Sequence, residues 1–122
     1  MKSTAAALML IVCATSARAS CDSSKTQTDL SICAGREYKA ADSDLTHAYA
    51  LAIANARRAG PSQEERLRKA QRAWIPFRDL ACAAEGGQRE GGSMEGMVIA
   101  MCLTRLTKER TRDLLIYASD DY

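Results

Sequence analysis

Apolar residues recur at steps of three and four along most of this chain, which is the spacing of one face of an α-helix. A first such run covers residues 28–58. A second follows Gly60-Pro61-Ser62 and reaches about Glu85, and a third begins beyond a glycine-rich stretch. No alternation long enough for a strand interrupts them. The pattern therefore predicts an all-α domain of three helices.

The two connections limit how these helices can be arranged. Ser62 is expected to cap the second helix, with Glu65 three residues later completing a capping box. Residues 86–92 hold four of the seven glycines and are expected to form a mobile loop. Because connections of about three and seven residues are short, neighbouring helices should be antiparallel, giving an up-down-up bundle.

The periodicity also predicts which residues form an alanine-rich, modest core. On the second helix the expected stripe is Leu67, Ala70, Trp74, Phe77 and Ala81. On the third, which Ser93 is expected to cap, the stripe is Met94, Met97, Val98, Met101, Cys102, Leu106, Leu114 and Tyr117. A core of this size makes covalent cross-links important for stability.

The N-terminus has the features of a secretory signal. Lys2 precedes the apolar run of residues 5–12, and small residues flank Arg18 at the positions that a signal peptidase reads. We expect residues 1–19 to be a cleaved signal peptide and residues 20–122 to be one exported domain. The apolar run is too short to span a membrane, and nothing later is apolar enough. A lipoprotein anchor at Cys21 is less favoured, because Arg18 stands where an aliphatic residue is expected.

Charge argues against a nucleic-acid partner. Cleavage after Ala19 would remove Lys2 and Arg18 from the 17 basic residues and leave 15 against 15 acidic residues. A neutral domain lacks the basic excess that phosphate neutralisation requires.

Cleavage would also leave an even number of cysteines, Cys21, Cys33, Cys82 and Cys102, which in a small exported domain predicts two disulfides. Pairing of neighbours in the chain, Cys21 with Cys33 and Cys82 with Cys102, is the favoured connectivity. A Cys33–Cys82 bridge remains an alternative, because the start of the first helix and the end of the second meet at one end of the bundle. No two cysteines have the close spacing of a zinc site or a C-x-x-C redox motif.

No catalytic constellation emerges from the chain. His47 is the only histidine, and its register places it on the solvent side of the first helix. No nucleophile with a base, cluster of metal ligands or phosphate loop can be assembled, so we predict neither an enzyme nor a cofactor or metal.

Residues 71–79 concentrate the only Trp, the only Phe and a central arginine. Trp74 and Phe77 are expected to pack in the core. Arg78 is expected to form a structural ion pair with Asp42, since these residues lie about 17 and 19 residues from the Pro61 turn and so at nearly the same height. In the glycine loop, Arg89 and Glu90 are candidates for contact with a partner.

The motifs of this chain resemble those of the LprI-like lysozyme-inhibitor family. The segment from Leu67 to Cys82 reads L-x-x-A-Q-R-A-W-I-x-F-R-D-x-x-C, and residues 102–114 read C-L-x-x-L-T-x-x-R-T-x-x-L. The opening from Cys21 to Tyr49 agrees as well, with Thr46 and Pro76 as two departures. The resemblance implies an exported helical protein of the bacterial envelope, in the periplasm. Asp42, Gln71, Trp74, Arg78, Asp79 and Arg110 are the residues expected to build its core and ion pairs.

Two functions follow as hypotheses. The resemblance implies an inhibitor that binds a lysozyme and blocks its cleft without catalysis. Because such a cleft holds catalytic carboxylates, a blocking element needs hydrogen-bond donors, and Arg89 of the glycine loop is the leading candidate. The alternative is a non-inhibitory periplasmic interaction or stress module, in which the same bundle contacts another envelope protein.

Overall fold

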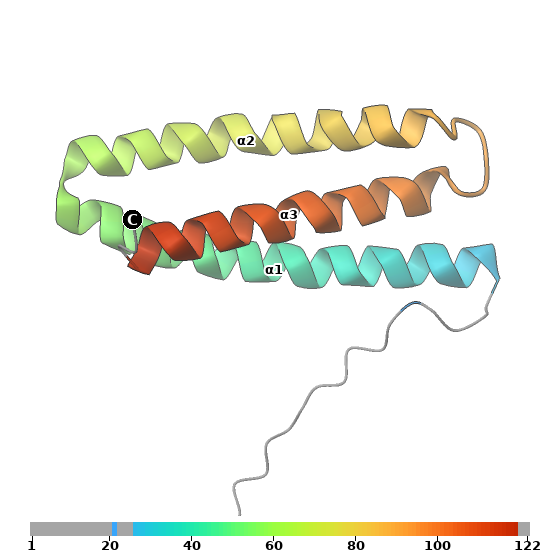
Figure 1. Cartoon of the computed structure of the whole chain (residues 1–122), viewed down its shortest axis with the longest axis horizontal. Coiled ribbons are helices and arrows are strands. Elements are labelled where there is room, and N and C mark those ends of the chain that lie inside the picture. Colours follow the sequence, from blue (N-terminus) through green and yellow to red (C-terminus); the bar gives the residue numbers. More distant parts are fainter. Residues whose placement is uncertain (1–20, 22–25, 120–122) are drawn as a thin grey trace, which may run out of the picture.

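A computed structural model describes residue 21 and residues 26–119, which form a bundle of three helices (Figure 1). Helix α1 spans Gln27–Ala59, α2 spans Pro61–Gly87 and α3 spans Glu95–Ser119. Helix α2 runs opposite to α1 and α3, so the predicted all-α, up-down-up bundle is confirmed. The described residues include no strand. The predicted signal peptide, residues 1–19, lies outside them.

Helix α1 begins with a capping box that the periodicity did not indicate. The Thr26 hydroxyl accepts a hydrogen bond from the Asp29 amide at 3.2 Å, and the Asp29 carboxylate accepts one from the Thr26 amide at 3.1 Å. Two amides that a helix start leaves without partners are satisfied in this way.

A single residue, Gly60, joins α1 to α2. Its amide donates to the carbonyl of Ala56, and its carbonyl accepts from the amide of Glu64. Its φ of 122° is a conformation that residues with a side chain rarely adopt. Pro61 then takes the first helical position, where its missing N–H costs nothing. The predicted capping box of Ser62 and Glu65 is therefore wrong, because α2 has already begun at Pro61.

The main apolar core lies in the half of the bundle nearest this turn. Helices α1 and α3 make the most extensive contact, since the alanines of α1 let the two backbones approach closely. The core cluster comprises Leu45, Ala48, Ala52, Ile53, Ala56, Leu67 and Leu114, with Tyr49, Trp74, Tyr117 and Ala118 packed against it.

Helix α2 buries only part of the stripe that its apolar residues predicted. Leu67 is buried and Trp74 packs against the core, as expected. Phe77 is 59% exposed, and Ala70 is exposed as well, so their predicted place in the core is wrong. The polar Gln71 and Arg78 are buried instead. Because both find hydrogen-bond partners on other helices, their burial carries no unsatisfied polar group.

The two predicted disulfides are present, and both lie toward the end of the bundle away from Gly60. Cys21 is bonded to Cys33 near the start of α1, and Cys82 of α2 is bonded to Cys102 of α3. The alternative Cys33–Cys82 bridge is wrong. The second bridge is enclosed, with both of its residues at most 1% exposed.

The glycine-rich stretch is shorter than its composition indicated, because Gly86 and Gly87 end α2 instead of opening a loop. Gly86 is buried against α3, and a Cβ atom there would collide with the side chain of Ile99. Helix α3 begins at Glu95. Met94 and Met101, which were expected in the core, are 40% and 56% exposed.

Candidate functional site

Arg78 forms a polar cluster at the middle of the bundle with one partner on each helix. Its Nη1 lies 3.2 Å from Asp42 Oδ1 of α1 and donates to Thr107 Oγ1 of α3 at 3.4 Å. Its Nε donates to Asp79 Oδ1 of α2 at 2.9 Å. The expected contact with Asp42 is therefore present, and the guanidinium joins all three helices.

Two aromatic rings enclose the same guanidinium. Its central carbon lies 5.5 Å from the centre of the Tyr38 ring and 5.2 Å from that of the Trp74 ring, both within cation–π range. The Arg78 side chain is only 8% exposed, whereas those of Asp42 and Asp79 are 50% and 54% exposed. The buried charge is thus balanced by two carboxylates that keep contact with water.

The pKa values of this cluster follow from its surroundings. Burial alone lowers the pKa of Arg78, but the hydrogen bond to Asp79, the neighbouring Tyr38 and Asp42 outweigh it, and the pKa is raised. Burial raises the pKa of Tyr38, which the positive charge of Arg78 only partly offsets. Both groups therefore keep their ordinary protonation state at neutral pH, and neither is prepared for proton transfer.

A second polar contact joins α2 to α3 apart from this cluster. Arg110 Nε of α3 donates to Gln71 Oε1 of α2 at 3.0 Å. The structure thus brings Asp42, Trp74, Arg78 and Asp79 into one cluster and places the Gln71–Arg110 pair separately. Tyr38 and Thr107 are the members that the sequence reasoning missed. Tyr38 could have been found from the sequence, because it lies four residues before Asp42 and therefore on the same face of the helix.

The other predicted site residues, Arg89 and Glu90, lie in an exposed loop of residues 88–94. Their amides donate to the carbonyls of Gly86 and Gly87, at 2.8 Å and 3.2 Å, and the Arg89 carbonyl accepts from Gly92 at 2.9 Å. Gly91, at a φ of 72°, donates to the Glu95 carboxylate at 2.9 Å. The loop is a series of hydrogen-bonded turns joining α2 to α3.

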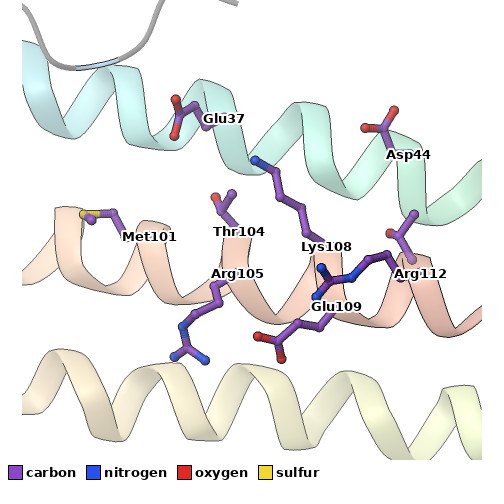
Figure 2. Close-up of a pocket in the computed structure, with 9 residues that line it drawn as sticks. Glu37, Asp44, Met101, Thr104, Arg105, Lys108, Glu109 and Arg112 are labelled. Atoms are coloured by element: carbon purple, nitrogen blue, oxygen red, sulfur yellow. The ribbon is translucent and has the colours of Figure 1, made fainter.

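A groove of about 710 Å³ runs between α1 and α3, and the sequence reasoning did not find it (Figure 2). In Figure 2 the Lys108 side chain extends toward α1, whereas Arg105 and Glu109 point toward α2. Glu37 and Asp44 line the α1 wall. Because three acidic and three basic side chains line it, the groove has no single sign of charge that would select a charged ligand.

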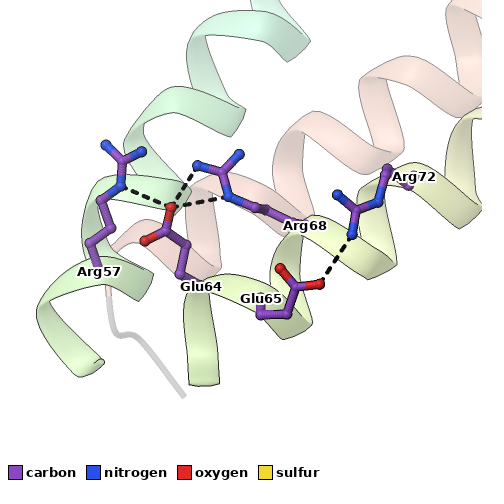
Figure 3. Close-up of polar contacts among 5 residues, drawn as sticks. All are labelled: Arg57, Glu64, Glu65, Arg68 and Arg72. Carbon is purple, nitrogen blue, oxygen red and sulfur yellow. Dashed lines mark hydrogen bonds and ion pairs between the residues drawn. The ribbon is translucent and has the colours of Figure 1, made fainter. Parts of the chain in front are cut away.

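An exposed ion network lies near the Gly60 turn (Figure 3). Glu64 Oε1 accepts from Arg57 Nε at 3.0 Å and from Arg68 Nη2 at 2.6 Å, and these hydrogen bonds lower the pKa of Glu64. Beside it, Glu65 pairs with Arg72 at 3.2 Å. This network ties the last turn of α1 to the first turns of α2.

The described part of the chain contains no group of three metal-ligating side chains that could hold an ion. None of the three helices is long and apolar enough to cross a membrane. His47 is exposed on α1, as its register predicted.

The fold and its contacts define a small disulfide-bonded helical bundle in which the buried Gln71 and Arg78 contact other helices. The model of the lysozyme inhibitor LprI family matches residues 17–114, and the chain belongs to this family. A relative from Rhizobium meliloti (strain 1021), described as "Uncharacterized protein R02472", is 39% identical over 132 residues, covering 93% of this chain and 94% of the relative. No solved structure matches the chain.

Proposed function

We propose that this protein is an exported, non-enzymatic inhibitor that binds a lysozyme and blocks its cleft. Membership of the family supports the inhibitory activity. The geometry of the loop of residues 88–94 supports this loop as the surface that binds the lysozyme. This loop holds an exposed arginine in a chain of hydrogen-bonded turns between two disulfide-linked helices.

The chemistry of a muramidase cleft explains why Arg89 is the leading contact. Such a cleft contains a pair of carboxyl groups on either side of the scissile bond. A guanidinium donates several hydrogen bonds in a fixed plane and can satisfy a carboxylate at two points. No hydrogen bond or ion pair within the described residues engages the Arg89 side chain, so it is available for that contact. Because the loop backbone is already ordered, less conformational entropy is lost on binding.

A turbidity assay of bacterial cells treated with lysozymes of several classes tests the proposal. The purified protein should slow clearing by at least one class. Arg89→Ala should weaken that inhibition about tenfold or more, the loss expected for one charge-assisted hydrogen bond. Arg36→Ala, at an exposed position on α1, is the matched control and should inhibit as the parent does.

Failure of the purified protein to inhibit any class at micromolar concentration would contradict the proposal. It would favour the alternative, a periplasmic interaction or stress module with another envelope partner. If the Arg89→Ala and Glu90→Ala variants inhibit as strongly as the parent, the protein is an inhibitor but a surface other than this loop binds the lysozyme.

A further inference from the structure

The outer face of α2 carries an apolar stripe that the bundle does not use. Its residues follow one another at alternating steps of three and four, all of them exposed: Ala70, Ala73, Phe77, Leu80, Ala84 and Gly87. We call this set the α2 seam. Phe77 and Leu80 at its centre are 59% and 71% exposed. In Figure 1, α2 forms one edge of the bundle. Helical register places the seam on the side of α2 away from Arg78 and Cys82, which are buried.

The spacing of the seam is that of the contact positions of a coiled coil. Steps of three and four repeat every seven residues, and they keep one apolar line facing a partner helix. No charged residue interrupts the seam between Ala70 and Gly87. Its alanines and terminal glycine would let a partner backbone approach closely, and its two large side chains are of the size that anchors an interface.

The charges at the two ends of the seam are complementary. Arg66, four residues before Ala70, is exposed and makes a hydrogen bond to Gln63 at 3.4 Å. At the other end, the Glu90 amide donates to the Gly87 carbonyl, which places Glu90 one tight turn beyond Gly87 and in line with it. One seam therefore begins with a cation and ends with an anion.

We propose that the α2 seam binds the α2 seam of a second copy of this chain, in antiparallel orientation about a two-fold axis. The heptad spacing then places Phe77 opposite Leu80, Ala73 opposite Ala84 and Ala70 opposite Gly87. The same register brings Arg66 of each copy to Glu90 of the other. A parallel arrangement would instead place like charges together at both ends.

The size of the seam sets the strength of this dimer. From Ala70 to Gly87 it is about 26 Å long. A contact of one helix on one helix at this length buries less than the roughly 800 Å² per partner of a standard stable interface. The dimer is therefore weak and forms at high protein concentration. Both copies keep the α1–α3 groove and the Gly60 turn outside the contact.

Sedimentation equilibrium of the full protein from about 1 μM to about 1 mM tests the proposal. The average mass should rise from one chain toward two. Leu80→Glu should weaken association more than about a hundredfold, because it buries two unpaired charges at the centre of the contact. The control is Ile116→Glu, which changes an apolar side chain that is 45% exposed on α3 and should associate like the parent.

Cysteine cross-linking tests the orientation. A mixture of Ala73→Cys and Ala84→Cys proteins should be joined by a short bismaleimide, whereas neither variant alone should be. In the proposed register two Ala73 positions lie about 16 Å apart along the helix axis. Cross-linking of Ala73→Cys with itself would overturn the antiparallel register.

Two outcomes of the sedimentation experiment would overturn self-association through the seam: a parent protein that stays monomeric at 1 mM, or a Leu80→Glu variant that associates like the parent. The seam would then be a surface for a different partner. These readouts involve no lysozyme, so they are independent of the inhibitory function.

Discussion

Arg78 and Glu64 each occupy the centre of an ion cluster on α2, but the two clusters differ in what surrounds the charges. The Arg78 side chain is 8% exposed, lies between two rings and contacts all three helices. The Glu64 side chain is 23% exposed, and its partners Arg57 and Arg68 are 60% and 35% exposed. The cluster with the shorter ion pair, 2.6 Å against 2.9 Å, is thus the one that is open to water. We therefore expect enclosure, more than bond length, to decide how much each cluster contributes to the stability of the fold.

The largest expected effect is that of Arg78→Ala. It removes an enclosed side chain that fills the space between Tyr38 and Trp74, so the free energy of unfolding should fall by about 2 to 3 kcal/mol. Asp42 and Asp79 remain hydrated, which keeps the loss below that of a fully buried pair. Urea denaturation measures it, with Arg78→Met, which retains much of the stem, recovering part of the loss.

In the open cluster, Arg68→Ala should leave the urea midpoint close to that of the parent. Equal losses at Arg68 and Arg78 would contradict the contrast between the two clusters. An Arg78→Ala protein that unfolds like the parent yet no longer binds a lysozyme would place Arg78 in a recognition surface instead.

A smaller effect is expected from Asp42→Asn. The Asp42 side chain is half exposed, and Asp79 would still neutralise Arg78, so the cost should be below about 1 kcal/mol. The same urea titration measures it. A loss as large as that of Arg78→Ala would mean that the ion pair, and not the packing of the arginine between rings, stabilises the centre of the bundle.

The smallest expected effect is on how steeply the stability of the protein falls at low pH. Hydrogen bonds from Arg68 and Arg57 lower the pKa of Glu64 from its ordinary value of 4.5. Its contribution to stability is therefore present above about pH 4.5 and is lost as the pH falls through the lowered folded-state pKa. Melting temperatures between pH 6 and pH 2 should show a shallower acid decline for Glu64→Gln than for the parent. Asp113→Asn, at an exposed position on α3, should leave the decline as steep as before.

Much of the fold could be predicted from the sequence because its signals are local or simple in geometry. Three amphipathic runs with short connections allow few arrangements, and pairing of neighbouring cysteines closes the shortest loops. The contact of Asp42 with Arg78 followed from counting residues on either side of one turn, since two antiparallel helices keep the same rise per residue.

The buried face of α2 could not be predicted in the same way. Periodicity assigns apolar residues to the core, but the burial of Gln71 depends on Arg110 of α3, and no property of α2 reports that partner. Gly86 is a similar case. The glycine-rich composition around it predicted a loop, but Gly86 lies in α2, where Ile99 of α3 occupies the space that a side chain would need. Both misses arise from contacts between helices distant in sequence.

Covalent and apolar stabilisation occupy opposite halves of this bundle. The core cluster lies toward the Gly60 turn, while both disulfides lie toward the loop that carries Arg89. Chemical reduction and loss of hydrophobic packing therefore attack different ends of the molecule. Reduction would first remove the covalent ties beside the loop that we propose as the inhibitory element. The redox state of its compartment would then act on the loop first and on the fold as a whole only afterwards.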